Sequence, residues 1–326
     1  MAKSQGEVGL EDMLKEMNEL SKKLEEVLKH KVVLLILHDL ASITRDIVDD
    51  IEFYLQEKED ERALKSGDLC IVLHTAGGDA DAAYHIGIRL QEFIGEGHKL
   101  IFLIPRFAKS AGTLLACAGN EIYLTPITEL GPIDPQIYVR ETGRWVSAKA
   151  IEGSLRQVIQ TLREAGGLDP RAIEAIVRRI PIVELGHYDS LIEHVKRLLK
   201  DLLERRMLKE ERNKAEKVAE TLVKGYMYHG KVIHPKEAQR LGLKVKILKG
   251  EALKATYSLY KQVKKLFSEI DKRIGPLLTL IREVELPLAP LIEKHDIEYG
   301  LIYIPTIREF RELESIQPSL PRTRRR

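Results

Sequence analysis

Residues Asp68 to Ile94, DLCIVLHTAGGDADAAYHIGIRLQEFI, contain the signals of a strand, a tight turn and a helix in immediate succession. The apolar run after Asp68 is typical of a strand that is buried on both faces. Gly77 and Gly78 allow positive φ angles in the turn. Beyond them, apolar side chains recur at helical spacing. A strand, a short turn and a helix form the repeating unit of parallel α/β sheets.

The same order of elements recurs along the chain. KLIFLIP (residues 99–105) predicts a second strand, which precedes a short helix starting at Ser110, and EIYLT (residues 121–125) predicts a third. KVVLLILHD (residues 31–39) predicts a buried strand, and PKEAQRLGLKVKIL (residues 235–248) predicts a helix and another strand. Alternating elements with short connections predict a layered α/β fold with largely parallel strands.

Helical patterns dominate the rest of the chain. Apolar positions recur at helical spacing over residues 10–28, and residues 43–65 predict a charged helix. From Trp145 to Tyr228 the pattern is almost wholly helical. We expect a further long helix over residues 252–283, followed by one more strand in a Pro-rich segment.

Composition indicates a core-forming chain with a highly charged surface. Of 326 residues, 44% are hydrophobic and 31% are charged, and the formal net charge is +2. Because this balance gives no global field of one sign, we expect no nucleic-acid partner. The arginines of Arg322–Arg326 predict a solvated tail, with contact to an acidic partner as the alternative.

Cysteine usage and hydropathy indicate the compartment. Cys70 and Cys117 lie in apolar stretches without metal-ligand spacing, so we interpret both as reduced core residues. No apolar run approaches the ~18 residues that span a bilayer. The start of the chain lacks the apolar segment of a signal peptide. We therefore expect a cytoplasmic protein.

Ser110, within FAKSAGTLLACAG (residues 107–119), is the candidate nucleophile. A peptidase serine needs a base and two N–H donors for the oxyanion. The first N–H groups of a helix are unpaired, so the N–H of Ala111 is one candidate donor. The N–H of Gly78, in the turn after the neighbouring strand, is the other. From these residues alone, a helix N-cap remains the alternative role of Ser110.

Longer stretches carry a family resemblance. LHTAGGDADAAYHIGIRL (residues 73–90) resembles the oxyanion turn of the Clp/crotonase superfamily of serine peptidases, with Ala76 in place of the usual Pro. FAKSAGTLLACAGNEIYLTPITELGPIDPQI (residues 107–137) resembles its nucleophile helix, and YMYHGKVIHPKEAQRLGLKV (residues 226–245) its closing unit. LGPIDPQ (residues 130–136) is similar to a signature of the serine dehydrogenase proteinase family, related to signal peptide peptidase A and the Clp protease subunit.

The resemblance covers about residues 30–250. It implies stacked βαβ units, peptide hydrolysis without a metal or other cofactor, and ring-like homo-oligomers. We expect an N-terminal amphipathic helix (residues 1–30) and a Clp/crotonase-like peptidase domain (residues 31–250) with a helical insertion at about residues 149–228. A helical C-terminal extension with a basic tail (residues 251–326) follows.

The general base has several candidates. In the Clp subunit it is a histidine in the stretch that here reads ELGPIDPQI, which holds Asp134 and no histidine. Asp134 is either a weak base or a turn residue between prolines. The Ser-Lys dyad of signal peptide peptidases has its lysine further along the chain, near a helix start, and Lys149 in RWVSAKAIEGSL matches that spacing and context. We therefore expect Lys149 to be the base.

Histidines are the fallback. His187, His229 and His234 lie in the helical region or at predicted turns, where a lone histidine is more often structural than catalytic. Lys109 is adjacent to Ser110 but is expected to point away from it around the helix.

The leading hypothesis is a serine peptidase. Ser110 attacks the peptide carbonyl, Lys149 removes its proton, and water hydrolyses the acyl-enzyme. An extended polypeptide is expected to bind beside the strand and turn that contain Thr75 and Gly77.

Two other functions remain open. One is a catalytically degenerate scaffold or peptide-binding protein, and the other is a crotonase-type acyl-CoA enzyme that uses the same N–H donors without a serine. The chain has no Walker-type loop, so any ATPase partner is a separate chain. A membrane partner is also possible.

Overall fold

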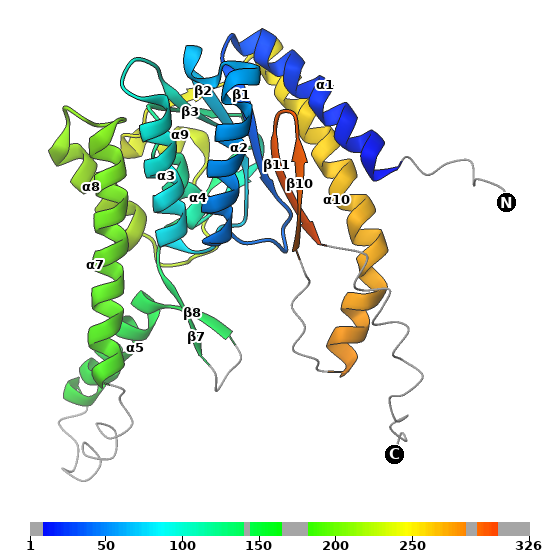
Figure 1. The fold of residues 1–326 in the computed structure, drawn as a ribbon. Helices are drawn as coiled ribbons and strands as arrows, with labels where there is room; N and C mark the ends of the chain where they lie inside the picture. The colour runs from blue at the N-terminus through cyan, green and yellow to red at the C-terminus, as the bar shows by residue number, and fades with distance from the viewer. Residues whose placement is uncertain (1–8, 140–143, 165–181, 285–291, 306–326) are drawn as a thin grey trace, which may run out of the picture.

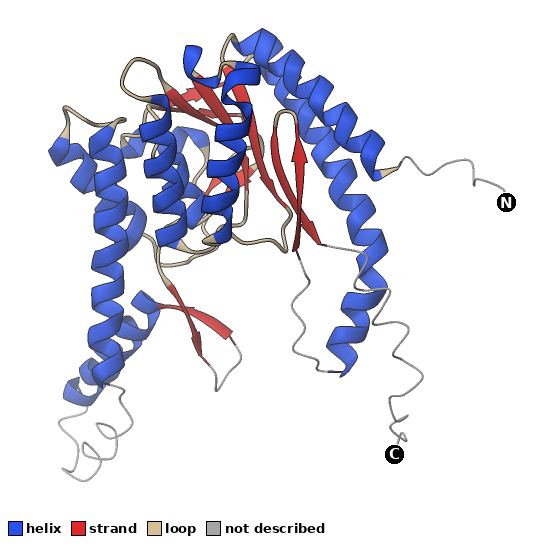
Figure 2. Ribbon diagram, in the orientation of Figure 1, coloured by secondary structure: helices blue, strands red, loops and turns tan. Residues whose placement is uncertain are grey.

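The computed structural model describes residues 9–139, 144–164, 182–284 and 292–305, in which strands and helices alternate (Figures 1 and 2). The strands are β1 (Lys31–Leu37), β2 (Leu69–His74), β3 (Leu100–Ile104), β4 (Phe107–Ala108), β5 (Glu121–Leu124), β6 (Glu129–Leu130), β7 (Gln136–Val139), β8 (Arg144–Ser147), β9 (Val245–Ile247), β10 (Ile292–Ile297) and β11 (Gly300–Pro305). The helices are α1 (Leu10–Leu28), α2 (Asp46–Arg62), α3 (Ala80–Ile94), α4 (Ala111–Ala116), α5 (Ala148–Glu164), α7 (Ile182–Arg205), α8 (Arg212–Lys224), α9 (Pro235–Leu241) and α10 (Gly250–Val284), with a 3₁₀ turn at Leu64–Ser66.

Within these ranges, seven strands form the central sheet in the order β10-β11-β1-β2-β3-β5-β9. All neighbouring pairs are parallel except β10–β11 at one edge. The short strands β4 and β6 pair in parallel, and β7 and β8 form an antiparallel hairpin. The predicted α/β fold with a largely parallel sheet is confirmed.

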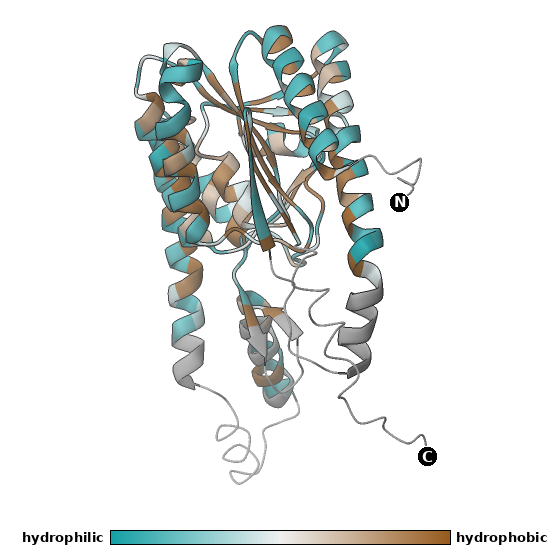
Figure 3. Cartoon of the chain, turned by 45° about the vertical axis from the view of Figure 1, so that its right-hand side comes forward, coloured by the Kyte–Doolittle hydropathy of each residue, from teal (hydrophilic) through white to brown (hydrophobic). Residues whose placement is uncertain are grey.

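Successive side chains of the central strands pack on opposite faces of the sheet. In β1, Val33 and Leu35 pack in the core with α2, α3 and α4, whereas Val32 and Leu34 pack with α1 and α10. Figure 1 shows α2 and α3 over one face and the paired helices α1 and α10 on the other side. In Figure 3 the strands are largely brown and the outer surfaces of the helices are teal. Burial on both faces explains the continuous apolar runs of these strands.

Local signals in the sequence account for several helix boundaries. The carboxylate of Asp79 accepts the N–H of Ala82 at 2.9 Å, which caps α3 at its predicted start. Helix α9 has Pro235 in its first turn and ends at Gly242, whose φ is 104°.

The C-terminal segment differs from expectation. We predicted one strand after the long helix, but the structure contains two, β10 and β11. Gly300 lies opposite Leu34, so β11 joins the central sheet beside β1. The sheet thus extends into residues 251–326, which we expected to form a helical extension. The division of the chain into three parts stays a prediction.

The helical region also begins later than predicted. Trp145 lies in β8, opposite Tyr138 of β7, and the first helix starts at Ala148. A two-stranded hairpin therefore precedes the helical arm. In Figure 1, α5 and the lower part of α7 extend below the sheet.

Two further expectations concern thiols and membranes. Cys70 and Cys117 are buried in the core without a disulfide partner, and burial raises the pKa of the Cys117 thiol to about 12. Across the described ranges, the helices lack the combination of length and apolar character needed to cross a membrane.

Candidate active site

Ser110 occupies a strained turn between the strand β4 and the helix α4. Its backbone angles are φ 49° and ψ −117°. In the described part of the chain, only Lys29 and Ala63 are other non-glycine residues with positive φ, and both adopt the left-handed helical conformation at helix ends. The conformation of Ser110 lies outside that region and costs roughly 1–3 kcal/mol. Strain of this kind is concentrated at functional positions.

The Ser110 side chain is not used to cap the helix. Ser110 is the N-cap residue of α4 and is half-buried, but its hydroxyl makes no capping hydrogen bond. A serine selected for capping accepts an N–H from the first turn. The local geometry therefore leaves this hydroxyl free for another role.

The turn after β2 lies against Ser110. At Gly77, with φ 115°, a Cβ atom would lie 2.8 Å from the carbonyl oxygen of Lys109 and 3.1 Å from the Cβ of Ser110. At Gly78, with φ 149°, a Cβ atom would overlap the backbone of Ile43. Both positions thus require glycine, because the backbones approach closely and take positive φ.

Hydrogen bonds orient the N–H of Gly78. Gly78 and Ile43 form a parallel bridge, in which the Ile43 N–H donates to the Gly77 carbonyl at 2.8 Å and the Asp79 N–H donates to the Ile43 carbonyl at 2.9 Å. In such a bridge, the N–H of the middle residue points away from the partner strand. Among the described residues, neither Gly78 nor Ala111 donates its N–H to another backbone group. Within the described residues these two N–H groups therefore have no backbone acceptor, and their role as oxyanion donors stays a prediction.

Thr75 and Gly77 form hydrogen bonds within the turn, and their contact with substrate stays a prediction. Thr75 is fully buried, and its Oγ1 accepts the Gly77 N–H at 3.1 Å. Its own N–H donates to the Phe107 carbonyl at 3.3 Å, and its carbonyl accepts the Lys109 N–H at 3.1 Å. These bonds tie the end of β2 to the segment that leads to Ser110.

Asp134 and Lys149 lie at the stem of the β7–β8 hairpin. Gln136 is opposite Ser147, and the Pro135 carbonyl accepts the Ala148 N–H at 3.0 Å. Asp134 directly precedes Pro135, and Lys149 directly follows Ala148 as the second residue of α5.

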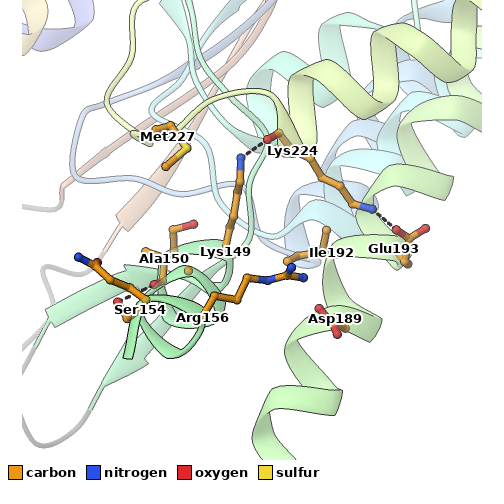
Figure 4. Close-up of a pocket in the computed structure, with 12 residues that line it drawn as sticks. Lys149, Ala150, Ser154, Arg156, Asp189, Ile192, Glu193, Lys224 and Met227 are labelled. Atoms are coloured by element: carbon orange, nitrogen blue, oxygen red, sulfur yellow. Dashed lines mark hydrogen bonds and ion pairs between the residues drawn. The ribbon is translucent and has the colours of Figure 1, made fainter. Parts of the chain in front are cut away.

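The Lys149 ammonium is held by the C-terminal end of α8 and the loop after it. Its Nζ donates to the carbonyl of Lys224, and the carbonyl of Tyr226 is 3.4 Å away (Figure 4). In the part of the chain that the structure describes, Lys149 has no hydrogen bond to Ser110.

Asp134 and His229 form a pair that the sequence did not predict. The Asp134 side chain is only 5% exposed, and one carboxylate oxygen lies 2.6 Å from the Nδ1 of His229. The other accepts the side-chain amide of Gln136 at 2.9 Å. The same loop therefore carries His229 and the carbonyls that hold Lys149, so three of the proposed base residues gather around one hairpin stem.

The remaining candidates lie elsewhere. His187 is exposed on α7, and His234 is exposed at the N-cap position of α9. The Nζ of Lys109 donates to Glu129 at 2.8 Å and to the Leu130 carbonyl at 3.3 Å. The Lys109 ammonium is therefore bound to the two residues of β6.

A cavity of about 880 Å³ lies beside Lys149, between α5, α7 and the end of α8 (Figure 4). Its apolar lining includes Ala150, Ile192 and Met227, and Lys149 forms part of its wall. Ser110 is not among its described lining residues. The cavity therefore adjoins one candidate base but not the candidate nucleophile.

Two buried histidines lie at the carboxyl ends of β1 and β2. His38 and His74 are each 2% exposed, and His74 packs on the Phe107 ring with centroids 4.1 Å apart. Burial lowers the pKa of His38, whose Nε2 is 3.3 Å from Asp271 of α10. The neighbouring His74, whose Nε2 is 3.8 Å from the carboxylate of Asp39, lowers the pKa of Asp39. These side chains join α10 to the sheet edge.

The described residues contain no group of three His, Cys, Asp or Glu side chains arranged to hold a metal ion. Sequence reasoning also missed Thr113, which bonds to both Ala108 and Gly131. Its only signal was a hydroxyl in an otherwise apolar helix, three residues after Ser110.

Comparisons with known proteins found similarity to one family model, to two curated proteins and to solved structures. Residues 17–158 match the family model of ClpP-like SDH-type serine proteinases. Two uncharacterized proteins of Methanocaldococcus jannaschii are similar to the chain. The first is 28% identical over 255 residues, covering 76% of this chain and 78% of the relative. The second is 29% identical over 175 residues, covering 54% of this chain and 51% of the relative.

Among solved structures, two variants of the membrane-bound stomatin-specific protease 1510-N are similar. One has a TM-score of 0.42 and 18% identity, covering 72% of this chain and 84% of that one. The other, in complex with a substrate peptide, has a TM-score of 0.41 and 19% identity, covering 68% of this chain and 77% of that one. The family model includes the Gly77–Gly78 turn, Ser110 and Lys149. Residues 17–158, less than half of the chain, are thus similar to the ClpP-like SDH-type serine proteinases.

Proposed function

We propose that the chain is a serine peptidase in which Ser110 is the nucleophile. The observation that carries this proposal is the turn itself. Ser110 is held at φ 49° and ψ −117° with no capping bond from its hydroxyl, beside a glycine turn. A strained strand-to-helix turn that presents a serine hydroxyl is the arrangement by which α/β hydrolases expose their nucleophile.

The N–H groups of Gly78 and Ala111 are the proposed oxyanion donors. Gly78 is exposed and its N–H points away from Ile43, and Ala111 begins the helix α4. The unpaired N–H at a helix start, with the helix dipole, favours the developing negative charge. Each such donor is worth about 10²–10³ in rate.

Lys149 is the proposed general base. As a neutral amine it takes the Ser110 hydroxyl proton while Oγ bonds to the carbonyl carbon of the substrate peptide. The resulting ammonium returns that proton to the departing amine. Water then attacks the acyl-enzyme, Lys149 takes its proton, and Ser110 Oγ leaves with the proton restored. To act in this way, Lys149 must release the Lys224 and Tyr226 carbonyls that it contacts here.

His229 is the second candidate base. Its 2.6 Å contact with buried Asp134 resembles the base and orienting carboxylate of a catalytic triad. With Nδ1 directed to Asp134, Nε2 remains to accept a proton. A histidine oriented by a carboxylate is a more common partner of serine than lysine is.

Labelling by a fluorophosphonate probe tests the nucleophile and distinguishes the two bases. Ser110→Ala should abolish labelling of the full chain. If Lys149 is the base, Lys149→Met should slow labelling by about 10²-fold or more, whereas His229→Gln should change it less than about threefold. The reverse pattern assigns the base to His229.

A matched control is Lys261→Met, which removes an exposed lysine of α10. It should label at the wild-type rate. No labelling of the folded wild-type chain would reject the peptidase proposal and favour a scaffold or peptide-binding role.

The cellular setting is also proposed. We infer a polypeptide substrate, a homo-oligomeric assembly and a cytoplasmic location, with any ATPase or membrane partner supplied by another chain. Size-exclusion chromatography with light scattering tests the assembly, since a monomeric mass at micromolar concentration would contradict it.

A further inference from the structure

Thr113 is the side chain that connects the Ser110 turn with the segment leading to the candidate bases. It is the third residue of α4 and is fully buried. Its Oγ1 donates to the Ala108 carbonyl at 2.7 Å and accepts the Gly131 N–H at 3.0 Å. This one hydroxyl thus connects the turn at Ala108 with the segment at Gly131, which lies 18 residues after Thr113.

The Gly131 backbone is also close to Ser110. A Cβ atom at Gly131 would lie 3.4 Å from the Ser110 backbone nitrogen and 3.1 Å from the Lys109 Cδ. The segment therefore passes directly alongside the nucleophile turn. Thr113 bonds the two backbones together at this approach.

A short segment with backbone hydrogen bonds connects Gly131 with the candidate bases Asp134 and Lys149. Ile133 donates its N–H to the Leu222 carbonyl at 2.9 Å, which leaves little freedom between Gly131 and Asp134. The next residue, Pro135, accepts the Ala148 N–H at 3.0 Å, adjacent to Lys149. A shift of Gly131 would therefore move the hairpin stem that carries Asp134 and Lys149.

We propose that Thr113 is a positioning residue for the reaction of Ser110. Its hydroxyl sets the spacing between the nucleophile turn and the hairpin stem, and it touches neither substrate nor reacting atoms. The inference rests on the proposed peptidase function. Small displacements in such a site lower the rate steeply, by about 10²-fold for 1 Å.

The test compares Thr113→Val with Thr113→Ser in the full chain. Valine keeps the shape but leaves the Ala108 carbonyl and the Gly131 N–H without their partner, whereas serine keeps the hydroxyl. The readouts are the maximal rate of fluorophosphonate labelling at Ser110 and the half-saturating probe concentration. Thr113→Val should lower the maximal rate at least about tenfold with a less than threefold change in half-saturation, and Thr113→Ser should restore it to within about threefold.

The matched control is Thr256→Val, which removes another fully buried threonine hydroxyl, bonded to the Ala252 carbonyl of α10 at 2.7 Å. It should leave the labelling parameters within about threefold of wild type. If Thr113→Val does not fold, Thr113→Cys decides, because a thiol is only a weak hydrogen-bond donor and acceptor. That variant should also lower the maximal rate at unchanged half-saturation.

The possible results distinguish the positioning role of Thr113 from the proposed peptidase function. A wild-type chain that fails to label rejects both. A wild type that labels, with folded Thr113→Val or Thr113→Cys at the wild-type rate, overturns only the positioning role. Loss of rate in Thr113→Ser equal to that in Thr113→Val would also overturn it, because packing of the methyl group would then be responsible.

Discussion

The two halves of the candidate site are built in different ways. The nucleophile half, Thr75 to Gly78 and Phe107 to Thr113, is held by backbone hydrogen bonds between segments that continue core strands. The base half, at Asp134, Lys149 and His229, is held by side chains that reach a loop. In that loop Met227 is 88% exposed. The first half is therefore fixed by the fold, whereas the side chains of the second are placed by a few contacts with that loop.

The largest expected effect comes from the nucleophile half. In Gly78→Ala the new Cβ meets the Ile43 backbone, so the turn must move and the oxyanion donor is displaced. Fluorophosphonate labelling should fall by about 10²-fold or more. The control is Gly67→Ala, where the Cβ meets nothing within 4 Å. If Gly78→Ala labels at the rate of the control, the fixed geometry of the Gly77–Gly78 turn is not needed for the reaction of Ser110.

A smaller effect is expected from the hydroxyl that holds the turn. Thr75→Val keeps the methyl that packs at Gly112 but removes the acceptor of the Gly77 N–H. We expect labelling to slow about tenfold and the free energy of unfolding to fall by about 1–3 kcal/mol, because a buried N–H loses its partner. Chemical denaturation measures the second quantity. A variant as stable and as reactive as wild type would show that Thr75 does not hold the turn.

Backbone strain at Ser110 gives an expected gain in stability. Glycine accepts φ 49° and ψ −117° without the steric penalty that alanine keeps. Ser110→Gly should therefore be about 1 kcal/mol more stable than Ser110→Ala, although neither can react with the probe. The comparison uses urea denaturation of both variants. Equal free energies of unfolding would show that the backbone at Ser110 is not strained.

These differences explain what the sequence alone could predict. The apolar runs and the Gly77–Gly78 turn are local signals, so the strands, the turn and the start of α4 followed from short stretches. The contact between Asp134 and His229 joins residues 95 positions apart, and nothing near either residue indicates it. For the same reason β11 was not expected beside β1. The hairpin before α5 was missed because its strands are short and precede a strong helical pattern.

The smallest expected effect lies outside both halves, at the contact of α10 with the sheet edge. Burial lowers the pKa of His38; Asp271 and Asp39 oppose this shift, and His74 adds to it. The unfolded chain therefore takes up the His38 proton at higher pH than the folded chain does. This contribution to stability is full above the ordinary value of 6.5 and is lost as pH falls from 6.5 towards the lowered pKa.

Denaturation from pH 7.5 to 5 with wild type and His38→Gln measures this contribution. The wild type should lose more stability than His38→Gln does, while exposed His187→Gln should follow the wild type. Parallel curves for wild type and His38→Gln would contradict the prediction.

The most direct test of the central claim is to map the site of probe attachment. The folded wild-type chain is treated with a fluorophosphonate, digested and analysed by peptide mass spectrometry. The structure predicts a phosphonyl adduct on Ser110, within residues 107–119, that is absent from Ser110→Ala. An adduct on another serine that persists in Ser110→Ala, or no adduct on the folded chain, would contradict the assignment of Ser110 as the nucleophile.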